Sequence, residues 1–123
     1  MHTNSNFKLY TEIIRYAKYV RRYVAANIPA VHRDIKIHLL DEIYNLKRFL
    51  IEAQYTKGNI RIKNITEMIV SISMIDILTD ELLELCSNNK KNIVKSIEIL
   101  TSIKNMTFAW RNNPEPNEKK QNS

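Results

Sequence analysis

Apolar residues recur every three or four positions along most of the chain, and the longest such run extends over residues 60–86. This spacing places side chains on one face of an α-helix, and the run contains neither glycine nor proline to interrupt it. We therefore predict a long helix here, and the rest of the chain is interpreted around it. Its first apolar face comprises Ile65, Met68, Ile69, Ile72, Ile75, Leu82, Leu83 and Cys86.

A second apolar set in the same run lies off that face. A helix that covers one surface of a monomer needs a single apolar stripe, so a second stripe requires burial on a second side. The helix either contacts a neighbouring subunit or lies deep within its own chain, and the pattern leaves both arrangements open. We expect the subunit contact. The second set comprises Val70, Met74, Ile77, Leu78 and Leu85.

Three further runs with the same spacing predict helices over about residues 7–27, 30–57 and 90–111. Pro29 separates the first two, because proline cannot continue a helix interior but can begin a helix at its first turn. The stripe of the first comprises Leu9, Ile13, Tyr16, Ala17, Val20 and Val24; that of the second Ile35, Leu39, Ile43, Leu46, Leu50 and Ala53; that of the last Ile93, Ile97, Leu100, Ile103, Met106 and Trp110.

The connections after the second and third runs carry residues typical of helix ends. Gly58 is the only glycine, and we expect it to cap the second helix in the left-handed conformation. Ser87, Asn88 and Asn89 are good caps for the last helix. Short connections favour antiparallel neighbours. The sequence thus predicts an all-α, antiparallel up-down-up-down four-helix bundle over residues 7–111, with a disordered N-terminus over 1–6 and a disordered tail over 112–123.

The charge is distributed unevenly along the chain, whose formal net charge is +6. Residues 1–30 carry five basic side chains against one acidic, and residues 89–123 carry seven against three, so each segment has a net charge of +4. Residues 59–88 carry two basic side chains against five acidic ones, a net charge of −3. This asymmetry suits a polyanionic partner for the basic surface, or association between the two kinds of surface.

The basic residues of the first and last predicted helices are the candidate site. In the first helix they fall within two turns and are interleaved with tyrosines, so they form either a solvated basic face or a patch that contacts phosphates and stacks on bases. In the last helix they lie in the first turns, where cations oppose the helix dipole. The candidates are Arg15, Lys18, Arg21 and Arg22, with Tyr10, Tyr19 and Tyr23 on the same helix, and Lys90, Lys91 and Lys95.

No residue pattern points to catalysis, a metal or a cofactor. The chain has no glycine-rich phosphate loop, and His32 and His38 are six residues apart, a spacing that does not place them on one helix face. Asp76, Asp80 and Glu84 line one face, but metal sites in bundles usually add Glu-x-x-His pairs, so we interpret them as a solvated acidic face. We expect a non-enzymatic cytoplasmic protein without a secretory signal or a membrane span.

Four segments carry a resemblance to a known family that covers residues 7–110: FKLYTEIIRYAKYV, VHRDIKIHLLDEI after the proline, LKRFLIEAQYTKGN and TSIKNMTFAWRNN. The chain resembles the bacterial four-helix-bundle proteins of ribosomal-RNA intervening sequences. Within them it looks most similar to the accessory variability determinant proteins of diversity-generating retroelements.

The resemblance implies a homopentameric ring that binds the element's reverse transcriptase and nucleic acid, chiefly template-repeat RNA and also DNA. The ring would support error-prone, adenine-directed complementary-DNA synthesis, with the chemistry left to the transcriptase. The family's basic residues match here by character more than by position, and the seven basic candidates named above are those carried over from it. The asparagine-rich helix ends and the acidic flank of the third helix depart from the family pattern. The alternative is a structural homo-oligomer of the intervening-sequence type without a transcriptase partner.

Overall fold

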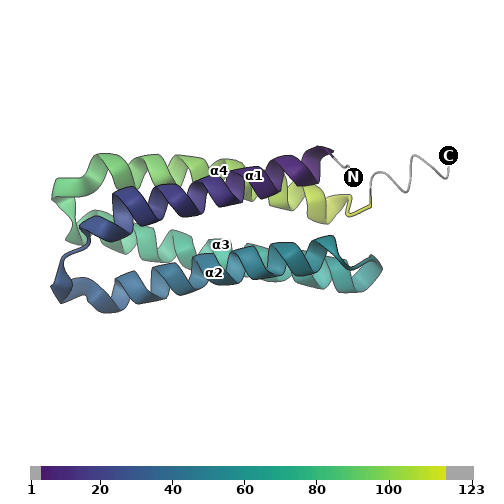
Figure 1. Cartoon of the computed structure of the whole chain (residues 1–123), viewed down its shortest axis with the longest axis horizontal. Coiled ribbons are helices and arrows are strands. Elements are labelled where there is room, and N and C mark those ends of the chain that lie inside the picture. Colours follow the sequence, from purple (N-terminus) through teal and green to yellow (C-terminus); the bar gives the residue numbers. More distant parts are fainter. Residues whose placement is uncertain (1–3, 116–123) are drawn as a thin grey trace.

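The computed structural model describes residues 4–115, which form four long α-helices joined by short turns (Figure 1). The helices are α1 (Asn4–Tyr19), α2 (Arg33–Gln54), α3 (Gly58–Leu85) and α4 (Lys90–Asn112). No strand occurs within this range, which confirms the all-α prediction for it. None of the helices found there is long and apolar enough to span a membrane.

The chain runs the length of the molecule four times and reverses at each turn, and α2 lies beside α3 while α1 lies beside α4 (Figure 1). This arrangement is compatible with the antiparallel bundle that the short connections favour. The α2–α3 turn lies at one end. The α1–α2 and α3–α4 connections lie together at the other end (Figure 1).

Short helical turns of other types extend or precede the long helices. α1 continues without a break into a π-helical turn, η1 (Val20–Val24), and a 3₁₀ turn, η2 (Ala25–Asn27). Two more 3₁₀ turns, η3 (Ala30–His32) and η4 (Ser87–Asn89), precede α2 and α4. The first helical segment therefore ends at residue 27 as predicted, but it begins at Asn4, before the expected residue 7.

The predicted stripes form one continuous core. All six stripe residues of α2 are buried, and so are five of the six in the first helical segment (α1 and η1), where Ala17 is half-buried. In α4 the stripe is buried except for Ile97 and Met106, which pack against the core partly exposed. Cys86 is buried among apolar neighbours, and burial raises the pKa of its thiol. Since every helix contributes to this cluster, the core holds all four together.

The second apolar set of α3 is mostly exposed in the single chain. Ile77 is 60% exposed and Val70 51%, and Met74 and Leu85 are exposed as well, whereas Leu78 is buried. The interpretation of α3 as a helix buried deeply on two sides by its own chain is therefore wrong. The four exposed residues remain an apolar stripe that no part of residues 4–115 covers.

Gly58 has the predicted positive φ of +60° but not the predicted position. It is the first residue of α3, while α2 ends at Gln54 with Tyr55 after it, so Gly58 does not cap α2. The last carbonyls of α2 instead accept hydrogen bonds from Arg61: Nε donates to Ala53 O at 2.9 Å and Nη2 to Gln54 O at 3.3 Å. A side chain from the next helix thus satisfies the end of α2.

Residues 113–115 pack back onto the α2–α3 turn. Pro114 O accepts hydrogen bonds from Arg61 Nη1 at 2.8 Å and from Trp110 Nε1 at 3.2 Å. The amide of Gly58 donates to Glu115 Oε1 at 2.6 Å. The expected disordered tail over 112–123 is therefore wrong for its first residues, since Asn112 also belongs to α4. The remainder of that tail, and residues 1–3, lie outside the described range.

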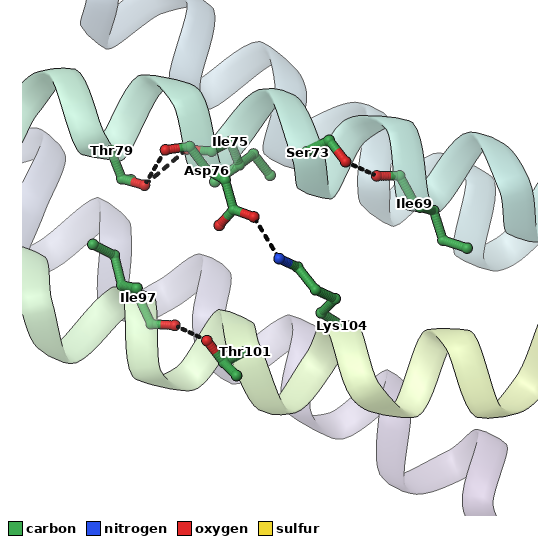
Figure 2. A network of polar contacts seen from close by, with 8 residues as sticks. All are labelled: Ile69, Ser73, Ile75, Asp76, Thr79, Ile97, Thr101 and Lys104. Atoms are coloured by element: carbon green, nitrogen blue, oxygen red, sulfur yellow. Dashed lines mark hydrogen bonds and ion pairs between the residues drawn. The ribbon is translucent and has the colours of Figure 1, made fainter.

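The predicted acidic face of α3 is only partly solvated. Asp76 is half-buried and pairs with Lys104 of α4 across 2.7 Å (Figure 2). Asp80 and Glu84 are exposed. Nearby hydroxyl groups, including those of Thr79 and Thr101, donate to carbonyls of their own preceding turns (Figure 2). The Asp76–Lys104 ion pair therefore links α3 to α4, and the solvated interpretation was wrong for Asp76.

Candidate nucleic-acid interface

All seven basic candidates are exposed on the surface. Arg15 pairs with Glu12 one turn away, across 3.7 Å. The other six have no ion pair with any carboxylate among residues 4–115. Exposed ion pairs of this kind contribute little energy, so even Arg15 remains available to another anion.

Two hydrogen bonds bring the two basic groups together at one end of the bundle. Asn89, which directly precedes Lys90, donates from Nδ2 to Tyr23 O across 2.9 Å. The hydroxyl of Tyr19 donates to Asn92 Oδ1 at 3.4 Å. Residues from the end of the first helical segment and from the start of α4 thereby form one surface. We call the seven basic residues, together with Tyr19 and Tyr23, the basic end.

A π-helical turn forms the part of the basic end that carries Arg21, Arg22 and Tyr23. The amide of Ala25 donates to the carbonyl of Val20, five residues earlier, which defines this turn. π turns inside α-helices are rare and occur frequently at functional sites. The carbonyl of Tyr23 accepts a second amide, from Asn27 Nδ2 at 3.0 Å, so side chains from two segments satisfy it.

Aromatic contacts connect the π turn to α1. The rings of Tyr19 and Tyr23 lie 4.9 Å apart between centroids at an interplanar angle of 45°. The guanidinium carbon of Arg22 lies 6.0 Å from the centroid of the Tyr23 ring, which is the outer limit of a cation–π contact. Burial, followed by the proximity of Tyr23 and Glu98, raises the pKa of the Tyr19 hydroxyl.

Asn89 and Asn92 are the positioning residues that the sequence did not reveal. Asn89 occupies the N-cap position of α4, as expected, but it makes no capping hydrogen bond to the helix backbone. Its Oδ1 instead accepts from Asn92 Nδ2 at 2.8 Å, while its Nδ2 reaches Tyr23. The only signal in the sequence was the asparagine-rich helix end, which was interpreted as a local cap.

The basic end offers cations, aromatic faces and amides, and no chemistry beyond binding follows from that set. Within residues 4–115 no group of three or more histidine, cysteine or carboxylate side chains gathers where a metal ion could be held. Exposed lysine and arginine side chains in this density attract phosphates, and tyrosines beside them can stack on bases.

Comparison with known proteins identified no relative of this chain. No family model matches the chain, and neither does any curated protein or solved structure. The basic end, the uncovered apolar stripe of α3 and the resemblance of the four sequence segments are therefore the features that bear on function.

Proposed function

We propose that the protein is a non-catalytic accessory protein of a diversity-generating retroelement. In this proposal it is a homo-oligomeric, pentameric ring that binds template RNA at its basic ends. It also binds the reverse transcriptase, and so supports mutagenic complementary-DNA synthesis. The RNA contact is the part that the geometry supports best.

The proximity of the two basic groups is the observation that supports RNA binding. Arg21 and Arg22 lie on the π turn that Asn89 contacts, and Lys90 follows Asn89 directly. Like charges gathered in this way repel one another unless an anion neutralises them, and Lys90 and Lys91 additionally oppose the positive end of the α4 dipole. A phosphate backbone supplies the required negative charge, and its binding releases counterions.

The exposed apolar stripes support self-association. Val70, Met74 and Ile77 form an uncovered stripe on α3. A second exposed set on α2, namely Ile37, Tyr44 and Ile51, recurs every seven residues and so lies along one side of that helix. Monomeric proteins rarely expose contiguous apolar surface of this kind. Closed symmetry makes a ring reasonable, and the number five follows from the family resemblance alone.

The transcriptase partner rests on the same resemblance. The alternative function is a structural homo-oligomer of the intervening-sequence type, whose basic end meets another protein. Gene neighbourhood separates the two: a reverse-transcriptase gene and a template repeat beside this gene favour the accessory role. Co-purification of the encoded transcriptase with the protein then tests the contact directly, and its absence in the presence of template RNA contradicts the accessory role.

Charge reversal at the basic end tests the RNA contact. Changing Arg15, Lys18, Arg21 and Arg22 together to Glu should abolish binding of a labelled RNA, measured by fluorescence anisotropy, while the helical circular dichroism is unchanged. Wild-type affinity should fall steeply with salt, because counterion release sets the slope. Unchanged RNA binding by the quadruple variant contradicts the proposal.

A matched control keeps the same change in charge but places it elsewhere. It replaces four basic residues on other helices or helix ends by Glu: Lys47, Arg48, Lys63 and Arg111. These residues lie on α2, α3 and the C-terminal turn of α4, away from the π turn and the start of α4. If the control loses as much RNA affinity as the quadruple variant, the effect reflects net charge and the basic end has no special role.

A further inference from the structure

The Tyr23 ring is exposed on the basic end, and neighbouring side chains contact both its ring and its backbone carbonyl. It is 41% exposed, and its own carbonyl accepts hydrogen bonds from Asn27 and Asn89 at 3.0 and 2.9 Å. Tyr19, whose ring packs against it, is in turn fixed to Asn92. Asn27 and Asn89 therefore fix the backbone of Tyr23 on the π turn, and Tyr19 packs against its ring.

Arg22 lies over the same ring at the longest distance that still counts as a contact. Its guanidinium carbon is 6.0 Å from the ring centroid, and it has no carboxylate partner among the residues the structure describes. An exposed arginine held only by a long cation–π contact moves outward at little cost. A flat π-system can then enter between the guanidinium and the ring, since both surfaces stack on nucleobases.

We infer that the Arg22–Tyr23 pair is a stacking site for an unpaired nucleobase, and that the basic end accordingly selects single-stranded over duplex nucleic acid. This inference rests on the proposed RNA-binding function and specifies its substrate class. Lys18 and Arg21, on the same helical segment, and Lys90 and Lys91, which follow Asn89, are the exposed cations available to the flanking phosphates. In a duplex the faces of the bases are already stacked on each other, so only the charges can act on it.

Three labelled probes of equal length separate stacking from charge. They are a single-stranded RNA of about 12 nucleotides, its blunt duplex, and an abasic strand with the same number of phosphates. The wild-type protein should bind the single strand about tenfold more tightly than the abasic strand, because each stacked base contributes affinity beyond the phosphates. This comparison uses no variant and so does not depend on any substitution being tolerated.

Substitution of Tyr23 then locates the effect. Tyr23→Leu should lose about tenfold in affinity for the single strand and bind the duplex and the abasic strand as the wild type does. Tyr23→Phe, which keeps the ring, should bind all three like the wild type. Tyr55→Leu, at an exposed tyrosine that directly follows α2, is the matched control and should change nothing.

The outcomes distinguish this inference from the function on which it rests. Equal binding of the single strand and the abasic strand, or unaltered binding by Tyr23→Leu, overturns the stacking site and leaves phosphate binding intact. Failure of the wild-type protein to bind any of the three probes in dilute buffer overturns the proposed function together with the inference. Selective loss of the single strand in Tyr23→Leu supports both.

Discussion

Asn89 donates a hydrogen bond of 2.9 Å to the backbone carbonyl of Tyr23, and this bond joins the start of α4 to the π turn. The two residues lie 66 positions apart in the sequence. Their contact brings the basic residues of the first and last helices onto one surface. Its removal therefore has consequences for both the stability and the binding of the protein.

Replacing Asn89 by Ala should weaken the basic end without unfolding the bundle. The variant loses one donor to Tyr23 and one acceptor for Asn92, which together should cost about 1–2 kcal/mol of unfolding free energy in urea. RNA affinity should also fall, because the two basic groups are no longer held together. Asn88→Ala is the control, since the Asn88 side chain makes no hydrogen bond within the described chain. Equal effects of the two substitutions would argue against the positioning role.

Charging the apolar stripe of α3 should break the proposed ring. Ile77 is 60% exposed in the single chain, so Ile77→Glu should leave the fold intact but place a charge inside a subunit interface. Light scattering should then give the mass of one 14.5 kDa chain, whereas the wild type gives a multiple of it. Val31→Glu, at an apolar position that is 80% exposed outside the stripe, should keep the wild-type mass. A monomeric wild type at micromolar concentration would refute the ring.

Removing the hydroxyl of Tyr16 should stabilise the protein. Tyr16 is completely buried in the core, and its hydroxyl has no hydrogen-bond partner within residues 4–115. Since an unsatisfied buried polar group is costly, Tyr16→Phe should raise the unfolding free energy by about 1 kcal/mol. Tyr44→Phe, at a tyrosine 63% exposed, should leave it unchanged. A loss of stability in Tyr16→Phe would mean that the hydroxyl is satisfied after all.

The same residue should make the bundle sensitive to alkali. Burial, with a smaller contribution from Asp76, raises the pKa of Tyr16 well above its ordinary value of 10.0, so the folded protein retains a proton that the unfolded chain releases. Stability from this group is complete below pH 10.0 and falls as the pH rises further, by up to about 1.4 kcal/mol per pH unit. The unfolding free energy, measured with urea between about pH 8 and 11.5, should show this fall in the wild type and a smaller fall in Tyr16→Phe. Parallel curves would contradict the assignment.

Arg61 should be the most important polar side chain for stability. It donates to the carbonyls of Ala53, Gln54 and Pro114, and its guanidinium carbon lies 5.8 Å from the Trp110 ring centroid. Arg61→Met keeps most of the aliphatic volume but loses these bonds, and should cost about 3 kcal/mol in urea unfolding. Lys63→Met, at an exposed position two residues on, should cost almost nothing. A loss below about 1 kcal/mol for Arg61→Met would show that water replaces its bonds.

The buried faces of the helices could be predicted from the sequence, because they depend on the periodicity of apolar residues. The stripe from Ile35 to Ala53 is buried without exception, because a spacing of three or four residues is itself the geometry of a helix face. The π turn was not predicted, since the buried Val20 and Val24 are four residues apart and this spacing fits an ordinary α-helix. Arg61 was counted only as a charge, because its role requires Pro114, which lies 53 residues away.

The candidate site was predicted residue by residue but not as a surface. Exposure of Arg22 and Lys90 follows from their positions opposite the apolar stripes, which the sequence contains. Their joining does not follow, because it depends on the Asn89–Tyr23 contact between segments far apart in the chain. The α3 stripe shows the opposite case: the sequence identified two faces, and only the packed chain shows that its own helices leave the second one uncovered.

The bond between Gly58 and Glu115 fixes the last described residue beside the α2–α3 turn, at the pole of the rod remote from the π turn. The two ends of the rod therefore carry different structures: the π turn and the start of α4 lie at one, and the bond from Gly58 to Glu115 lies at the other. A tether attached at the exposed Asn113 would hold each copy by its far pole and leave the π turn directed into solution. Immobilised in this orientation, the protein keeps the proposed RNA-binding surface clear of the support.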